Sequence, residues 1–203
     1  MDKWITHCPE IGQAIDVVWG AFAAGGKLLT CGCGGSAADA SHIAGELVKG
    51  FELPHGLPGA LAQRIERAVV GDLASRLQCG LPCISLAADS AVLTAIVNDI
   101  GGDAIFAQQV AALGRPGDVL LGISTSGRTP AVVNAAAVAH ALGMKVIGLT
   151  GAAGGALASA CDVAVRVPAA ATAEVQQLHA AVYHHMCREI ERRAAEALRV
   201  ERE

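Results

Sequence analysis

Apolar and polar residues follow two alternating patterns along the chain. Five short runs are almost entirely apolar, at 27–32, 80–88, 118–124, 145–151 and 162–168. Segments with apolar residues at helical spacing lie between them, at 36–49, 90–99, 104–114 and 129–143. Strands that alternate with helices in this way predict right-handed crossovers and a central parallel five-stranded sheet with helices on both faces, an α/β architecture.

The two ends of the chain and one internal segment complete the pattern. An N-terminal helix is predicted over 9–25 and a long closing helix over 172–199. Segment 51–79 is inserted between the first helix of the sheet and the second strand, where connections usually have only ~2–6 residues. We interpret 1–203 as a single domain, because the chain is too short for two of ordinary size. We expect the insertion to be either functional or mobile, and to flank the functional site.

Composition and charge exclude several classes of partner. The net charge is −4 and no block of lysine and arginine occurs, which argues against nucleic acid. The seven cysteines include no CxxC pair, so a disulfide scaffold or a structural zinc knot is not indicated. The sequence shows neither a secretory leader nor an apolar run of the ~18 residues that a membrane helix needs. We therefore expect a cytoplasmic protein with no nucleic-acid or membrane partner.

Two polar loops follow predicted strands and lead into helices. "GCGGSA" follows the first strand and "STSGRT" the third. Ligands of open α/β sheets bind beyond the carboxyl ends of the strands, and the N–H groups of a helix N-terminus favour an anion. A serine or threonine before a helix can also be a simple N-cap, but two such loops at one sheet edge favour an anion site. Neither loop has a nucleotide-binding motif, so we predict a sugar phosphate. The hydroxyls available are those of Ser36, Ser124, Thr125, Ser126 and Thr129.

The helix after the first loop carries an imidazole and a carboxylate on one face. His42 and Glu46 are four residues apart, so their side chains are neighbours. The simplest interpretation is an exposed pair worth ~0.2–0.5 kcal/mol. The surrounding segment "ASHIAGELV" is mostly apolar, however, which indicates that the polar groups are buried for a purpose. A metal site or proton transfer beside a phosphate site is the functional alternative.

Several longer stretches resemble a known family. They are "GCGGSAADASHIAGEL", "TAIVND", "GRPGDVLLGISTSGRTPAVVNAA", "GMKVIGLTG" and "TAEVQQLHAAVYHHMC". Together they resemble the bacterial sedoheptulose 7-phosphate isomerases, or phosphoheptose isomerases, a branch of the sugar-isomerase (SIS) domain superfamily. The resemblance covers nearly the whole chain apart from 51–79. It implies a flavodoxin-like three-layer sandwich, a homotetramer with active sites between subunits, and aldose–ketose isomerisation.

The resemblance also implies roles for individual residues. Ser36 matches a serine that touches the substrate, and Asp99 an acidic residue near the sugar. The phosphate-binding loop of the family matches Ser124, Thr125, Ser126 and Thr129. In family members that hold zinc, the ligands match His42, Glu46, Gln176 and His184, and Gln176 also matches a substrate contact. We therefore expect one zinc ion per subunit.

The chain departs from the family pattern at three points. Cys33 replaces an asparagine in the first loop, and Gly50 stands where the family has an arginine, with Lys49 as the nearest cation. Glu174 replaces a second arginine at the start of the final helix. Two lost cations put the identity of the sugar in question, whereas the fold and the type of reaction depend on them less.

Isomerisation through an enediol needs a base for the carbon-bound proton and a partner for the oxygens. Glu46 fits the base if burial raises its pKa toward neutrality. His184 fits the partner, because imidazole titrates near pH 7. A zinc ion could orient or polarise the sugar oxygens, but Glu46 and His184 could not freely be ligands and proton carriers at once.

Other candidate residues have simpler interpretations. We expect His55, His140 and His185 to be packed or surface histidines, and we leave His179 open between a structural role and the site. The pair Cys31 and Cys33 is interpreted as non-metal. Three arginines of the insertion form either a solvated helix face, which we favour, or replacements for the missing family arginine; they are Arg64, Arg67 and Arg76.

These observations leave several functions open. The first is a phosphoheptose isomerase that converts sedoheptulose 7-phosphate to D-glycero-D-manno-heptose 7-phosphate for heptose nucleotide synthesis. A variant acts on a related sugar phosphate in a specialised pathway. A non-enzymatic alternative is a tetrameric adaptor of the bacterial replication initiator, but such proteins tend to lack the four residues of the metal site. A sugar-phosphate sensor would carry a DNA-binding segment, which we do not find before residue 9. We predict the isomerase.

Overall fold

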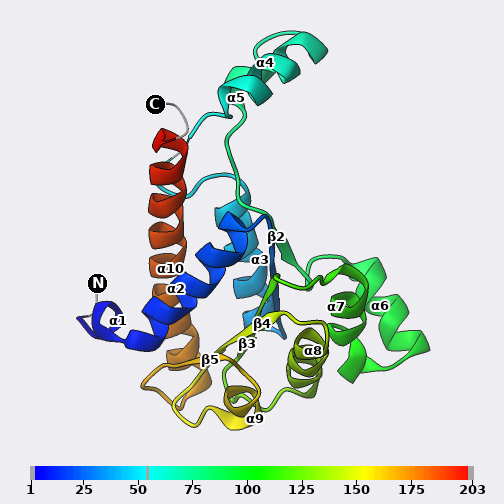
Figure 1. The fold of residues 1–203 in the computed structure, drawn as a ribbon. Coiled ribbons are helices and arrows are strands. Elements are labelled where there is room, and N and C mark those ends of the chain that lie inside the picture. Colours follow the sequence, from blue (N-terminus) through cyan, green and yellow to red (C-terminus); the bar gives the residue numbers. More distant parts are fainter. Residues whose placement is uncertain (1–2, 54, 201–203) are drawn as a thin grey trace.

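The structure, a computed structural model, describes residues 3–53 and 55–200 (Figure 1). Positions 1–2, 54 and 201–203 of the predicted domain and insertion lie outside the described residues. Within the described part, five parallel strands form one sheet in the order β2-β1-β3-β4-β5. This is the strand order of flavodoxin-like folds, so the predicted α/β fold is confirmed. The strands are β1 (Leu28–Gly32), β2 (Cys83–Ser85), β3 (Val119–Ser124), β4 (Lys145–Thr150) and β5 (Val163–Arg166).

Helices cover both faces of the sheet and make three layers (Figure 1). Strand residues alternate between the two cores: Leu28 faces α2, α3 and α10, whereas its neighbour Leu29 faces α7 and α8. The first face carries α2 (Pro9–Ala23), α3 (Gly35–Val48) and α10 (Thr172–Val200). The second carries α6 (Ser90–Asp99), α7 (Ala107–Leu113), α8 (Pro130–Ala141) and α9 (Gly155–Ser159). The short helix α1 (Lys3–His7) precedes α2.

Two predicted elements differ from the structure. The strand expected over 80–88 is reduced to β2, because Pro82 has no N–H for the ladder and offers only its carbonyl, to the N–H of Leu28. The helix expected over 104–114 is interrupted. A 3₁₀ turn at Gly102–Ala104 comes first, Phe106 then turns into the core, and α7 begins at Ala107.

The strand order places both polar loops beside each other. From β1 the chain moves outward to β2, and it then returns to β3 on the other side of β1. This reversal is the topological switch point, where ligands of such sheets bind. Gly32 at the end of β1 pairs with Ile123, next to Ser124 at the end of β3. The loops after β1 and β3 therefore leave the same edge of the sheet side by side.

The inserted segment forms an arm with two helices, α4 (Gly59–Ala68) and α5 (Leu73–Arg76). Both helices project away from the sheet, and neither contains a buried residue (Figure 1). The base of the arm is closed by an antiparallel bridge between Gly56 and Gln78 and by a 2.8 Å hydrogen bond from the N–H of Cys79 to the carbonyl of His55. The predicted solvated face is confirmed, since three arginines of the arm are exposed: Arg64, Arg67 and Arg76.

Two further observations concern the thiols and the helices. All seven cysteines are free, including Cys31 and Cys33 in the first strand and loop. Burial raises the pKa of Cys83 to about 12 and also raises that of Cys31, so these thiols are unreactive packing groups. Among the described residues, no helix combines the length and the apolar character needed to cross a membrane.

Candidate active site

The candidate site lies on the seam between α3 and α10. The two helices can approach closely because α3 presents small residues: a Cβ atom at Gly35 would collide with the side-chain amide of Gln176. Further along, Ile43 and Leu47 of α3 join the same core as Val182 of α10. Packing of this apolar stripe fixes which polar side chains of the two helices face each other along the seam.

Three predicted residues meet on this seam. His42 Nε2 lies 2.9 Å from Glu46 Oε1, and the rings of His42 and His184 are edge to face with their centroids 5.0 Å apart. Lys49 Nζ donates to the other oxygen of Glu46 at 3.1 Å. His184 also stacks on Phe51, with ring centroids 5.6 Å apart. The cluster of His42, Glu46 and His184 is thus one compact polar site that opens to solvent beside His42.

The charge state of Glu46 differs from the expectation. Burial acts to raise the pKa of Glu46, but hydrogen bonds from Lys49 and His42 outweigh burial and lower it. The carboxylate is therefore ionised at neutral pH, and the predicted rise toward neutrality is wrong for the chain alone. Burial and the neighbouring His42 lower the pKa of His184, so its imidazole is neutral at pH 7.

Two neighbours of the cluster were not predicted. The hydroxyl of the buried Tyr183 lies 3.2 Å from His42 Nδ1 and donates to Asp39 Oδ1 at 3.3 Å. Burial, together with the Asp39 charge, raises the pKa of Tyr183 to about 12, so the hydroxyl keeps its proton. The sequence held a signal for Asp39: with His42 and Glu46 it occupies positions i, i+3 and i+7 of one helix face.

Two predicted residues meet where the first loop enters α3: Ser36 in the first turn of α3, and Gln176 of α10, which packs against it. Ser36 is buried, and a Cβ atom at Gly32 would collide with it, so only glycine allows β1 to end so close to the helix. Gln176 packs against Gly35, about two helical turns before His184 on α10. The structure therefore separates Gln176 from the other three predicted metal ligands and places it beside the loop.

The second loop joins β3 to α8. The hydroxyls of Ser124 and Thr129 lie 2.9 Å apart, and Ser126 Oγ accepts the N–H of Arg128 at 3.2 Å. Thr129 precedes α8 without using its side chain as a helix cap, so its hydroxyl remains available at the N-terminus. A cavity of about 290 Å³ adjoins the loop and is lined by residues that include Thr125, Ser126 and Arg128.

Asp99 is not brought to the cluster. It ends α6 on the opposite face of the sheet from α3 and α10, where it is exposed and accepts the side-chain amide of Asn98 at 2.7 Å. The position of Asp99 therefore does not support its predicted contact with a sugar bound at the cluster of the same chain.

The donor set for the predicted zinc is made of side chains from α3 and α10. No group of three or more His, Cys, Asp and Glu side chains in the described residues is already arranged to hold a metal ion. The chemistry of the donors is nevertheless suitable, because two imidazoles and a carboxylate are ordinary zinc ligands. His42 Nε2 already faces the Glu46 carboxylate, and the ring of His184 packs against the ring of His42. The residues thus fit a metal at three of the four predicted positions.

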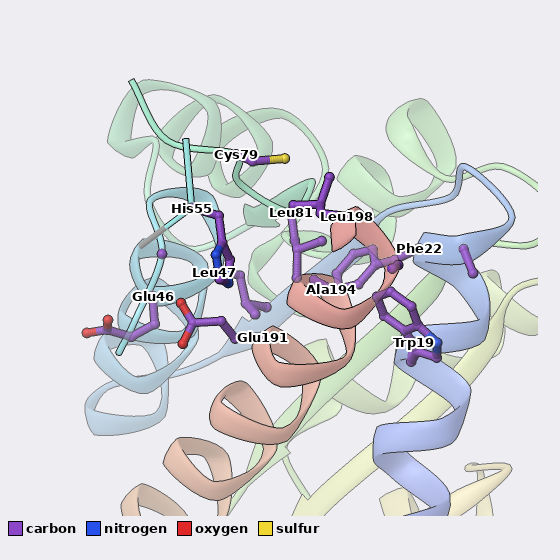
Figure 2. A pocket seen from close by; sticks show the side chains of 13 residues that line it. Trp19, Phe22, Glu46, Leu47, His55, Cys79, Leu81, Glu191, Ala194 and Leu198 are labelled. Carbon is purple, nitrogen blue, oxygen red and sulfur yellow. The ribbon is translucent and has the colours of Figure 1, made fainter. Parts of the chain in front are cut away.

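A second carboxylate lies beside the site, in a cavity of about 240 Å³ between α2, α10 and the base of the arm (Figure 2). Glu191 of α10 is buried and accepts the backbone N–H groups of Phe51, Glu52 and Leu53 at 2.6, 2.8 and 3.0 Å. Figure 2 shows Glu191 and His55 at the polar end of this cavity, with Trp19 and Phe22 at its apolar end.

The remaining histidines are structural or peripheral. His140 is half exposed and pairs with Asp162 at 3.0 Å, and His185 is half-buried on α10. His179 is fully buried, and burial lowers its pKa to about 4 although the backbone of Thr150 acts in the opposite direction. His179 is therefore a neutral interior group, distinct from the open cluster.

The chain is similar to known proteins in both sequence and fold. The model of the SIS domain family matches residues 5–67 and 55–151. The phosphoheptose isomerase of Rhodospirillum rubrum is 44% identical over 179 residues, which cover 88% of this chain and 83% of that protein.

Two solved structures of phosphoheptose isomerases have the same fold. The enzyme from Francisella tularensis superposes with a TM-score of 0.77 at 36% identity and covers 93% of this chain and 89% of its own. The enzyme from Neisseria gonorrhoeae superposes with a TM-score of 0.74 at 38% identity, and covers 91% and 86%. With a family match over most of the chain and relatives of this identity, the chain belongs to the phosphoheptose isomerase family of SIS-domain proteins.

Proposed function

We propose that this chain is an aldose–ketose isomerase that converts sedoheptulose 7-phosphate to a heptose 7-phosphate of the D-glycero-D-manno type, for heptose nucleotide synthesis. One observation carries the mechanism. The Glu46 carboxylate is ionised and largely enclosed, with 14% of its side chain exposed, yet its partners are side chains that can move rather than backbone groups. Such a carboxylate can exchange one hydrogen-bond partner for a substrate atom.

Proton transfer is assigned to two residues of the cluster. Glu46 removes the proton from C1 of the ketose and returns it to C2, which passes through an enediol. His184 is neutral at pH 7, so it can both accept and donate a proton as hydrogen moves between the two sugar oxygens. Phe51 stacks on the His184 ring and holds it in place during this exchange.

The phosphate is assigned to the switch point. The hydroxyls of Ser124, Ser126 and Thr129 lie at the N-terminus of α8, where helix N–H groups and the helix dipole favour an anion. Ser36 in the first turn of α3 and Gln176 on α10 lie beside the neighbouring loop and would contact the sugar between the phosphate and the cluster. Arg128 adds a cation to the loop after β3, on the cavity that adjoins that loop.

We also propose one zinc ion per subunit, held by His42, Glu46 and His184, with Glu46 and His184 carrying protons only while they are not ligands of the metal. When bound, zinc supplies Lewis-acid polarisation of the sugar carbonyl and its oxygens. The support is the donor chemistry of the three residues and the 2.9 Å approach of His42 to Glu46. Gln176 would join this set only through a shift of its side chain, since it packs against Gly35.

The assembly proposed is a cytoplasmic homotetramer with active sites between subunits. The open side of the cluster supports a second wall supplied by another copy, since 44% of the His42 side chain is exposed. Asp99 could contact sugar only at such a shared site, because it lies across the sheet from the cluster of its own chain. Seven free thiols are consistent with a reducing compartment.

The direct test is incubation of the purified protein with sedoheptulose 7-phosphate in D₂O, followed by NMR of the products. We expect an aldose 7-phosphate that carries deuterium at C2, because the proton held by Glu46 exchanges with solvent. No conversion of this ketose, with conversion of a different sugar phosphate, would keep the reaction type and replace the substrate. No conversion of any sugar phosphate would overturn the proposal.

A further inference from the structure

The phosphate loop, residues 124–129, lies beside the turn that follows β4. This turn, residues 151–155, leads into α9, and it leaves the same edge of the sheet because Ser124 of β3 pairs with Thr150 of β4. Both segments contribute residues to the lining of the cavity of about 290 Å³. The function proposed above gives the turn no role.

Hydrogen bonds occupy three backbone carbonyl groups of the phosphate loop. The N–H of Gly151 donates to the Thr125 carbonyl at 3.0 Å, and the N–H of Leu157 in α9 donates to the Gly127 carbonyl at 2.9 Å. Within the loop, the N–H of Gly127 donates to the Ser124 carbonyl at 3.0 Å. Carbonyl and phosphate oxygens are both acceptors, so a carbonyl turned toward a phosphate dianion would repel it. These hydrogen bonds keep the three carbonyl oxygens engaged with N–H donors instead.

The backbones of the loop and the turn also touch directly. Gly127 has a φ of +63°, and a Cβ atom there would collide with the carbonyl group of Gly154. A Cβ atom at Gly155 would lie 2.5 Å from the carbonyl oxygen of Gly127. Glycine permits this approach because it has no Cβ atom and adopts positive φ at little cost. The turn is therefore a close-fitting support that limits movement of the loop.

We propose that the turn 151–155 is a positioning element for phosphate binding, and that Gly127 and Gly151 are the positioning residues at its contact with the loop. The turn holds the loop in its binding conformation before substrate arrives, so that binding does not have to order the loop. The inference rests on the phosphate assignment of the proposed function and concerns binding alone. Loss of the support should therefore raise KM and leave kcat nearly unchanged.

The test combines steady-state kinetics on sedoheptulose 7-phosphate with the Kd of inorganic phosphate, measured by titration with ³¹P NMR. Gly127→Ala places a Cβ atom against the turn and forces the loop and the turn apart. We expect KM and the phosphate Kd to rise ~10–100-fold, the contribution of one hydrogen bond to a charged group. The value of kcat should stay within about threefold of wild type, because the lost interaction is one of binding.

A milder variant and a matched control accompany it. In Gly151→Ala the new Cβ atom would lie 2.8 Å from the Thr125 carbonyl oxygen, so this variant should fold and raise both constants by a smaller factor. The control is Gly143→Ala, just after α8, where φ is +75° and a Cβ atom would have its nearest neighbour at 3.7 Å. It imposes the same left-handed backbone cost without pressing on the loop, and should change neither constant. Thermal unfolding of all three variants separates loss of stability from loss of binding.

Wild-type KM and phosphate Kd in Gly151→Ala, and in Gly127→Ala if it folds, would overturn the inference and leave the proposed function standing. An equal loss of binding in Gly143→Ala, or a loss confined to kcat, would overturn it as well. If wild-type protein binds no inorganic phosphate and Ser124→Ala leaves KM unchanged, the phosphate assignment itself fails, and the inference fails with it.

Discussion

Two glutamates, the partly buried Glu46 and the buried Glu191, line the same cavity from neighbouring helices (Figure 2). Glu191 accepts three backbone N–H groups, from Phe51, Glu52 and Leu53, and these donors are fixed by the chain. Glu46 is held by His42 and Lys49, whose side chains can rotate away. Both carboxylates are largely withdrawn from solvent, but the hydrogen-bond donors of Glu191 are backbone groups and those of Glu46 are side chains.

This difference separates a structural carboxylate from a reactive one. Glu191 already accepts three hydrogen bonds from the start of the arm, so it ties that segment to α10 and has little capacity left for a ligand. Glu46 retains its charge and can give up a donor at small cost, because 62% of the Lys49 side chain is exposed to water. The identity of the donors, more than burial, assigns the function of each carboxylate.

The largest expected effect tests this assignment at Glu46. Glu46→Gln keeps the shape of the side chain but cannot accept a carbon-bound proton, so turnover should fall ~10²–10⁴-fold, the usual contribution of a positioned base. Folding and substrate binding should be nearly unchanged, as measured by thermal unfolding and by calorimetry with substrate. A variant that keeps more than about a tenth of wild-type turnover would leave His184 as the leading base.

The same substitution at the other carboxylate is the matched control. Glu191→Gln replaces a charged acceptor of three hydrogen bonds by a neutral one, so we expect a loss of about 1–3 kcal/mol in the free energy of unfolding. The turnover of the folded fraction should stay near that of wild type. If Glu191→Gln lost turnover and kept its stability, Glu191 would be a reactive carboxylate and not a structural one.

A smaller effect is expected at Lys49, through the pKa of Glu46. The Glu46 pKa is lowered although burial opposes this, and the hydrogen bond from Lys49 is the largest of the lowering causes. Lys49→Met should therefore raise the Glu46 pKa in an NMR titration of metal-free protein. Because a base acts only when ionised, the acid limb of kcat/KM should move to higher pH. Lys49→Arg keeps the donor and should leave both values near wild type; a shift equal to that of Lys49→Met would exclude the hydrogen bond as the cause.

The sequence predicted the sheet and part of the site, for reasons that the structure explains. Strand positions and the two loops follow from local patterns, and the helical spacing of His42 and Glu46 correctly placed them side by side. The family resemblance named His184 as a site residue, and the structure places its ring against the ring of His42.

Features that depend on contacts between distant segments could not be predicted. The pKa of Glu46 depends on the position that the Lys49 side chain adopts. The hydrogen bond from Tyr183 to Asp39 joins residues that are 144 positions apart in sequence, and it forms only because α10 packs against α3. Glu191 had no signal at all in the pattern, because its partners are backbone groups of an inserted segment.

The smallest effect is expected from the helices of the arm. Residues 57–77 leave and re-enter the base at Gly56 and Gln78, which already pair with each other, so a short glycine linker can replace them. Since α4 and α5 contain no buried residue, excision should change the free energy of unfolding by less than about 0.5 kcal/mol. Turnover of sedoheptulose 7-phosphate should also persist, because the base of the arm remains tied to Glu191. Kinetics with several sugar phosphates and analytical ultracentrifugation measure the outcome. A changed preference among sugars would show that the arm flanks the active site, as the sequence predicted. A changed oligomeric state would instead give its exposed apolar side chains, such as Val70 and Leu73, a partner in another copy of the chain.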